Sequence, residues 1–127
     1  MINNSNIKIL VLDDDTMVRE NLNDYLEDEG FFVKSFIDAE TALTHLINET
    51  YHLAIVDMRL PGIDGNTFIL KSHSIDPCLK YIIHTGSSNY NLIDELIKIG
   101  IDPNQVYIKP VSDMSLLVNK IHELLHS

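Results

Sequence analysis

Four apolar runs of the chain end in side chains that could do chemistry, namely acids, a hydroxyl and an amine. These side chains are Asp13, Asp14, Asp15, Asp57, Thr85 and Lys109. Crowded carboxylates raise one another's pKa unless a cation lies between them, and carboxylates with carbonyls and waters are the usual ligands of Mg²⁺. A lysine can pair with an anion, and a hydroxyl can hydrogen-bond one of its oxygens. Together these groups predict a phosphoryl-transfer site, where catalysis is mostly positioning and charge neutralisation.

The acids are expected to divide the work. Asp57 is the predicted nucleophile, which would form an aspartyl phosphate. Asp15 is expected to be the N-cap of the helix that Thr16 opens. One cap does not explain both Asp13 and Asp14, so these two are the predicted metal ligands.

These groups meet only if the apolar runs are neighbouring strands. Strands are expected at 7–12, 31–36, 53–56, 81–84 and 106–108, and helices at 16–29, 66–73, 91–99 and 113–126. One further helix is expected after Asp38, which is its predicted N-cap. In the helix 91–99, Ile93, Leu96 and Ile97 are expected to face inward. Continuously apolar strands that alternate with helices predict an α/β fold with a parallel sheet covered on both faces. Right-handed crossovers favour a doubly wound, flavodoxin-like sheet of order 2-1-3-4-5.

Composition limits the possible partners and location. The 127 residues suit one domain, divided here into a polar tail at 1–6 and the domain at 7–127. A net charge of −10 argues against binding to nucleic acid or to anionic membranes. One cysteine, Cys78, excludes an internal disulfide and favours a reducing compartment. With no signal-like or bilayer-length apolar run, the expected location is cytoplasmic.

Four segments carry a resemblance to a known family, in the expected order. Residues 9–15, with their acidic ending, resemble the first strand and acidic pair of bacterial two-component response-regulator receiver domains, the chemotaxis-regulator-like superfamily. Residues 57–65 resemble the phosphoacceptor loop of that family, 82–86 the strand that delivers its switch hydroxyl, and 108–110 its Lys-Pro pair. The match covers essentially the whole chain.

The resemblance implies a role for each residue around the metal. Asp57 would accept a phosphoryl group from the phosphohistidine of a sensor histidine kinase or a phosphotransfer protein. Asp14 would bind Mg²⁺ directly and Asp13 through water, while Asp57 and the backbone carbonyl of Arg59 would complete the protein ligands. Mn²⁺ could substitute for Mg²⁺. The domain would catalyse only its own phosphorylation and dephosphorylation.

The resemblance also implies a switch. Lys109 would pair with the phosphoryl oxygens, and Thr85 would move toward the phosphate. That movement would change the surface of the fourth helix, fifth strand and fifth helix, which would take a partner, a homodimer copy or an output domain. The family usually has an aromatic residue where this chain has Val106, and here the tyrosine is Tyr107. Since neighbouring strand residues face opposite ways, Tyr107 is expected to point into the packed side.

Other functions stay open at this point. The chain could be a degenerate receiver that only binds proteins, or a Mg²⁺-dependent aspartyl-phosphate phosphatase of the haloacid-dehalogenase type, although Met17 stands where that pattern has Thr or Val. An FMN carrier shares the fold, but an acidic first loop would repel the phosphate. The histidines at 45, 52, 73, 84, 122 and 126 make no convincing metal spacing and are expected to be satisfied or solvated. Alternation is expected to turn His84 away from the acidic rim.

Overall fold

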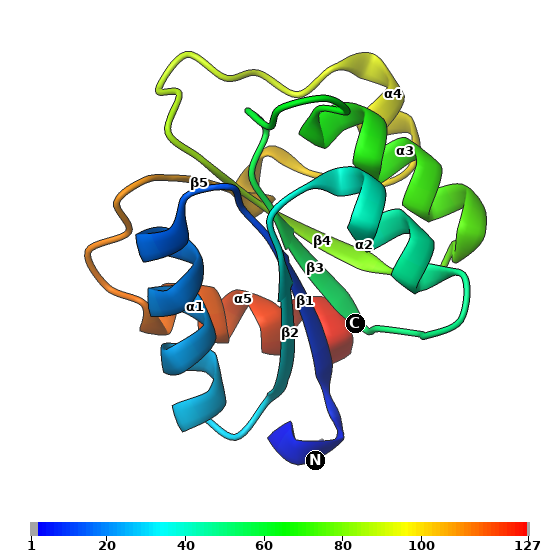
Figure 1. Cartoon of the computed structure of the whole chain (residues 1–127). Helices are drawn as coiled ribbons and strands as arrows, with labels where there is room; N and C mark the ends of the chain where they lie inside the picture. The colour runs from blue at the N-terminus through cyan, green and yellow to red at the C-terminus, as the bar shows by residue number, and fades with distance from the viewer. Residues whose placement is uncertain (1–2, 127) are drawn as a thin grey trace.

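The computed structural model describes residues 3–126, and its centre is one five-stranded parallel sheet. The strands lie in the order β2-β1-β3-β4-β5, as Figure 1 shows, so the predicted fold class and strand order are confirmed. Their bounds are β1 Lys8–Leu12, β2 Phe32–Phe36, β3 Leu53–Val56, β4 Lys80–Thr85 and β5 Val106–Ile108.

Helices cover both faces of the sheet. Their bounds are α1 Thr16–Asp28, α2 Ala39–Leu46, α3 Gly65–Ile75, α4 Asp94–Lys98 and α5 Ser115–His126, with two short 3-10 helices at Asn4–Asn6 and Pro103–Gln105. α1 and α5 pack on one face, whereas α2, α3 and α4 pack on the other (Figure 1). The result is the three-layer arrangement that alternating strands and helices predict.

Aspartates set the start of three helices. The side chain of Asp15 accepts a hydrogen bond from the Val18 backbone N at 3.2 Å, and that of Asp38 accepts one from Thr41 at 2.7 Å. Asp64 caps α3 in the same way. Each such cap contributes about 1 kcal/mol to stability. The predicted capping roles of Asp15 and Asp38 are confirmed. Asp15 therefore caps α1, whereas Asp13 and Asp14 lie at the rim.

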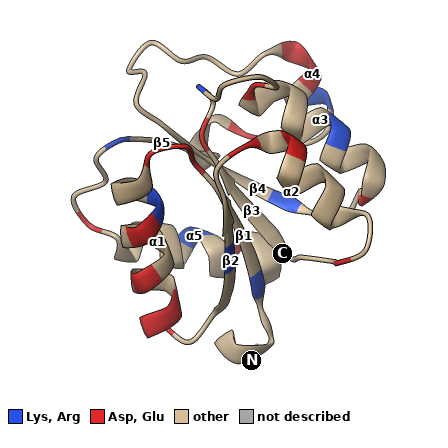
Figure 2. Cartoon of the chain, in the orientation of Figure 1, with Lys and Arg blue, Asp and Glu red and all other residues tan. Residues whose placement is uncertain are grey.

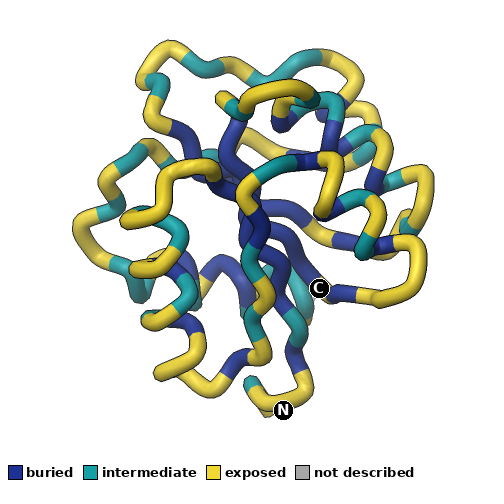
Figure 3. The backbone as a smooth tube through the Cα atoms, viewed as in Figure 1, coloured by how far each residue is buried: buried dark blue, intermediate teal, exposed yellow. Residues whose placement is uncertain are grey.

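The core lies in two layers, because successive strand residues point to opposite faces of the sheet. Figure 3 shows the central strands β1, β3 and β4 as the most deeply buried part of the sheet, whereas the edge strands β2 and β5 are more exposed. The layer under α2, α3 and α4 takes Leu10, Leu12, Ala54, Val56, Tyr81 and Ile83 from the strands. The layer under α1 and α5 takes Ile9, Val11, Leu53, Ile55 and Ile82. Buried on both faces, the central strands form a rigid base for the carboxyl-end rim.

The predicted helix 91–99 is wrong in length and in one inward residue. α4 spans only Asp94–Lys98, because the preceding Ile93 is extended and offers no side-chain cap. Leu96 is buried as expected, but Ile97 is 50% exposed, and Ile99 packs on the core instead. Gly100 ends the helix with a φ of +102°.

The segment before β1 is fixed to the end of α1. Asn4 donates a hydrogen bond from its side-chain amide to the Glu29 carbonyl at 2.7 Å. Met1 and Ile2 of the expected tail, and Ser127 of the expected domain, lie outside the described residues. Within residues 3–126, no helix combines the length and hydrophobicity needed to cross a bilayer.

Candidate functional site

The ends of β1 and β3 place two acids side by side. Asp13 and Asp57 are the first residues after these strands, and each continues the parallel hydrogen-bond pattern by one step. The Asp13 backbone N donates to the Phe36 carbonyl at 3.1 Å, and the Asp57 backbone N donates to the Leu12 carbonyl at 2.9 Å. The central strands therefore fix both backbones at the rim, where the topology predicts a site.

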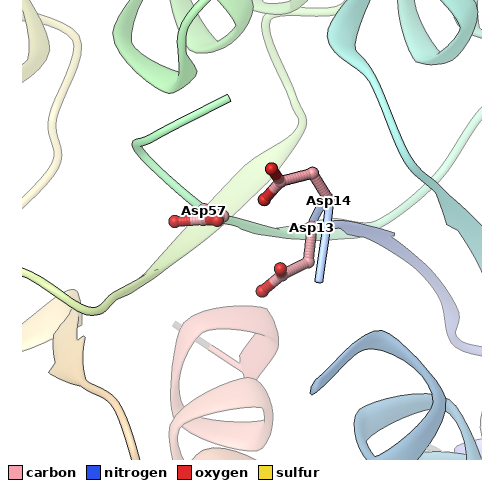
Figure 4. A group of neighbouring side chains, drawn as sticks. All are labelled: Asp13, Asp14 and Asp57. Atoms are coloured by element: carbon pink, nitrogen blue, oxygen red, sulfur yellow. The ribbon is translucent and has the colours of Figure 1, made fainter. Parts of the chain in front are cut away.

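Three carboxylates lie close together at this rim (Figure 4). One oxygen of each of Asp13, Asp14 and Asp57 lies within 4.8 Å of the other two. Asp13 is 1% exposed and Asp57 is 5% exposed, whereas Asp14 is open to solvent. Figure 2 also shows acidic positions at the end of β1 and along α1.

This donor set fits a hard divalent cation. All three ligand groups are carboxylate oxygens, and the open side at Asp14 leaves room for water, which Mg²⁺ retains when it binds proteins. Two of the oxygens are already oriented, because Asp13 Oδ1 accepts from the Asp15 backbone N at 2.9 Å and Asp57 Oδ1 accepts from the Arg59 backbone N at 3.3 Å. Asp13, Asp14 and Asp57 could therefore hold Mg²⁺.

Lys109 supplies the positive charge of the site. Its Nζ lies 2.7 Å from Asp13 Oδ2 and 3.3 Å from Asp57 Oδ2. Burial alone would lower the pKa of the Lys109 ammonium, but its hydrogen bond to Asp13 and the charges of Asp13 and Asp57 outweigh burial and raise the pKa. The lysine therefore stays charged and bridges the two buried carboxylates.

Asp57 is held in a less favourable environment for an anion. Burial raises the pKa of its carboxyl and the charge of Asp13 adds to the effect, while Lys109 and the Arg59 backbone N–H oppose it. A carboxylate that gains little from water is available to a cation or an electrophile at the rim.

Thr85 lies at the end of β4, beside the lysine. The Lys109 backbone N donates to the Thr85 carbonyl at 2.7 Å, which sets the lysine opposite the end of β4. The Thr85 side chain is buried, and its Oγ1 accepts from the Ser87 backbone N at 3.2 Å. The structure thus places Asp13, Asp14, Asp57, Thr85 and Lys109 at one rim, with Thr85 hydrogen-bonded to its own loop.

Two residues that support the site were not singled out from the sequence. Gly65 packs so closely under the loop that a Cβ would lie 2.5 Å from the Asp57 carbonyl oxygen and 2.7 Å from the Met58 Cα. Arg19 reaches back from α1 and donates from Nη1 to the Asp13 carbonyl at 3.0 Å. The glycine directly after the capping Asp64 was a usable signal, whereas nothing in the spacing of Arg19 indicates this contact.

His84 departs from the prediction made for the histidines. It points away from the acidic rim toward α1, as alternation predicts, but it is neither satisfied nor solvated. The residue is 4% exposed, and among the described residues neither ring nitrogen has a hydrogen-bond partner. Burial, followed by the charge of Lys109, lowers the pKa of His84 to about 4, against the smaller opposing effect of Asp13. The imidazole is therefore neutral at physiological pH.

Comparison with known protein families identifies the family of the chain. The sequence profile described as "response regulator receiver domain" matches residues 9–122. The chain belongs to this family. The resemblance that the four segments carry is therefore confirmed, and the receiver domain accounts for nearly the whole sequence.

Individual relatives agree with this assignment of the receiver domain. The transcriptional regulatory protein FixJ of Bradyrhizobium diazoefficiens is 33% identical over 72% of this chain and 45% of its own length. Sporulation initiation phosphotransferase F of Bacillus subtilis is 30% identical over 75% of this chain and 77% of its own length. The chain spans 45% of the length of FixJ. It spans 20% of the C4-dicarboxylate transport transcriptional regulatory protein DctD of Rhizobium meliloti and 32% of the uncharacterized transcriptional regulatory protein YesN of Bacillus subtilis. These longer relatives therefore have further parts that the chain does not match.

Solved structures give the same fold as the receiver domain. A CheY-like receiver domain protein of Methanospirillum hungatei is similar with a TM-score of 0.80 and 33% identity, over 94% of both chains. The response regulator TrrA of Thermotoga maritima, described in complex with Mg²⁺ and BeF, has a TM-score of 0.79 and 28% identity, over 94% of this chain and 99% of its own.

Proposed function

We propose that this receiver domain is a phosphorylation-controlled switch in which Asp57 accepts a phosphoryl group from the phosphohistidine of a sensor histidine kinase or a phosphotransfer protein. The observation that carries the proposal is the buried Asp57 carboxylate, 3.3 Å from the Lys109 ammonium and grouped with Asp13 and Asp14. A nucleophile, a fixed cation and an acidic metal cluster in one place are what phosphoryl transfer to an aspartate requires.

No group of this chain has to give or take a proton in the transfer. A carboxylate oxygen of Asp57 forms a bond to phosphorus while the phosphorus–nitrogen bond of the donor breaks. The donor imidazole takes the electron pair, and it leaves neutral when its other ring nitrogen carries a proton. Lys109 faces the attacking carboxylate and would pair with the phosphoryl oxygens as they arrive. The Thr85 hydroxyl, whose oxygen accepts from the Ser87 backbone N, would move and donate a hydrogen bond to one of these phosphoryl oxygens.

A metal would share the charge at this site. Asp14 would hold Mg²⁺, or Mn²⁺ in its place, together with Asp57, with the Arg59 backbone carbonyl and with Asp13 through water. The bound ion supplies positive charge against the phosphoryl oxygens. Asp13 would keep its ion pair with Lys109, so that the lysine stays aligned with Asp57.

The output of the switch is a protein surface. α4, β5 and α5 each expose one large aliphatic side chain, which are Ile97, Ile108 and Leu116. This is the surface we propose for an output domain, a second copy or another partner. The domain would act in the cytoplasm and without direct contact to nucleic acid, and its catalysis would be limited to its own phosphorylation and dephosphorylation.

Mass spectrometry of the intact protein tests the acceptor. The chain is incubated with Mg²⁺ and acetyl phosphate, and we expect one added phosphoryl group. The group should not be added when the metal is chelated before the incubation. Asp57→Asn should abolish the adduct. Asp24→Asn, which changes an exposed acid of α1, is the matched control and should leave it intact.

The outcomes separate the possible functions. No adduct with any phosphodonor would contradict the switch and favour a degenerate receiver that only binds proteins. Repeated turnover of a phosphate ester would favour the phosphatase. An adduct that survives in Asp57→Asn would mean that another side chain is the acceptor.

A further inference from the structure

A pocket opens on the side of the sheet opposite to Thr85. It has a volume of about 160 Å³ and lies between α1 and the segment 109–114 that leads from β5 toward α5. Val18, Leu22 and the polar Asn21 form its α1 wall, and Val111 and Met114 form the facing wall. The walls are mainly apolar, so the pocket offers a ligand burial away from water.

His84 brings a buried polar group to the pocket. Its imidazole lines the pocket from the end of β4 while being 4% exposed, and within residues 3–126 neither ring nitrogen is hydrogen-bonded to the protein. Both nitrogens are themselves buried, so the ring has to turn within the pocket before a ligand can pair with one of them. A buried polar group without a partner costs free energy, and a ligand that pairs with it recovers that cost. A neutral imidazole has one donor and one acceptor nitrogen, so a ligand hydroxyl or N–H suits it.

Charge at the edge of the pocket selects against ions. Lys109 also lines the pocket, but its ammonium is engaged by Asp13 at 2.7 Å and by Asp57 at 3.3 Å. An anionic ligand would therefore meet a lysine whose charge is already neutralised, beside two carboxylates. A cation would have to lose its water among aliphatic walls, which is costly.

The volume sets the size of the ligand. An apolar cavity of about 150 Å³ is large enough to take up benzene. We propose that this pocket binds a small, uncharged ring compound of the size of phenol, whose hydroxyl or N–H group hydrogen-bonds to the His84 imidazole. Because Lys109 borders both this pocket and Asp57, occupancy would also alter phosphoryl uptake, and only this last consequence rests on the proposed function.

Binding of phenol and of toluene to the full chain tests the proposal. Toluene has the same ring but no hydrogen-bonding group, and both affinities are followed by NMR titration. We expect saturable binding of phenol at one site. His84→Leu keeps the walls but removes the imidazole, and it should lower the ratio of phenol affinity to toluene affinity about fivefold, the worth of one hydrogen bond.

A second variant tests the location. Val18→Phe fills the pocket from the half-buried face of α1 and should abolish binding of both compounds, with its NMR spectrum showing that it is folded. His122→Leu, a histidine change on α5, is the control and should leave both affinities unchanged. Phenol that does not saturate the wild-type chain, or that binds Val18→Phe equally well, would overturn the pocket. An unchanged phenol-to-toluene ratio in His84→Leu would overturn the role of His84.

Discussion

Two neighbouring regions at the carboxyl ends of the strands, the acidic rim and the His84 pocket, treat buried polar groups in opposite ways. At the rim, two buried carboxylates share the Lys109 ammonium and accept backbone hydrogen bonds. In the pocket, His84 is equally buried but has no partner among residues 3–126. The two regions meet at Lys109, whose ammonium faces the acids and which also lines the His84 pocket.

The difference shows two ways in which the protein tolerates a polar group whose burial costs free energy. The buried charges at the rim are tolerated because each has an opposite charge or a hydrogen bond. The imidazole avoids the cost of a buried charge by staying neutral, but its lost hydrogen bonds are not replaced. In the two functions proposed above, the acids would serve a cation and a phosphoryl group, and the imidazole would serve an uncharged ligand.

Removing Lys109 should have the largest effect, because both acids depend on it. Lys109→Ala should lower the rate of phosphoryl uptake from acetyl phosphate about 100-fold or more, the usual cost of removing one preorganised group that stabilises developing charge. The rate is measured by intact mass against time. Lys71→Ala, which removes an exposed lysine of α3, is the control. Equal rates for Lys109→Ala and the control would mean that the lysine serves only to stabilise the buried acids.

Lowering the pH should reveal the cost of burying His84 as a loss of stability. The pKa of His84 falls from 6.5 to about 4 on folding, so in this window the unfolded chain binds a proton that the folded chain does not. Stability that is present above the unfolded pKa is therefore lost as the pH falls toward the folded pKa. For His84 this loss is about 2 kcal/mol between pH 7 and about pH 4.5.

Urea unfolding at both pH values measures this loss. His84→Leu should not show this loss. As the pH falls, the free energy of unfolding should therefore decrease less in the variant than in the wild type. Lys109 and Asp13 are the charges that face the ring, and both remain in this variant. His122→Leu serves as the control. A parallel pH dependence of wild type and His84→Leu would show that His84 takes up a proton in the folded state.

Neutralising Asp57 should have a smaller effect of the opposite sign. Burial and the charge of Asp13 raise the pKa of Asp57, so its contribution to stability is present at low pH and is lost as the pH rises through the folded pKa. Asp57→Asn should therefore raise the free energy of unfolding at pH 7 by about 1 kcal/mol, since Lys109 keeps its partner Asp13. The gain should disappear in acid. A variant less stable than wild type at pH 7 would mean that the Asp57–Lys109 pair stabilises the fold.

The features of this fold that could be predicted from the sequence are those that a local pattern or a periodicity determines. The strand order, the capping by Asp15 and Asp38, and the direction of His84 follow from apolar runs, capping chemistry and alternation. The extent of α4 was mispredicted because tertiary packing, which the local pattern does not contain, decides whether residues 91–93 join the helix. The unpaired state of His84 is equally invisible, since it depends on α1 and on the segment after β5. Arg19 and Gly65 act through contacts with Asp13 and Asp57 that only the folded chain brings together.

A change in β5, the strand that leads to Lys109, should have the smallest effect. Val106 packs on the core under α2, α3 and α4, whereas Tyr107 packs with α1 and α5, as alternation predicts. Val106 is paired with Ile83, whereas Thr85 is paired with Ile108. Val106→Ala should therefore change the rate of phosphoryl uptake less than about twofold, because the reacting groups are untouched. Leu116→Ala, an exposed change on α5, is the matched control. A large drop for Val106→Ala alone would show that the packing of β5 controls phosphorylation itself.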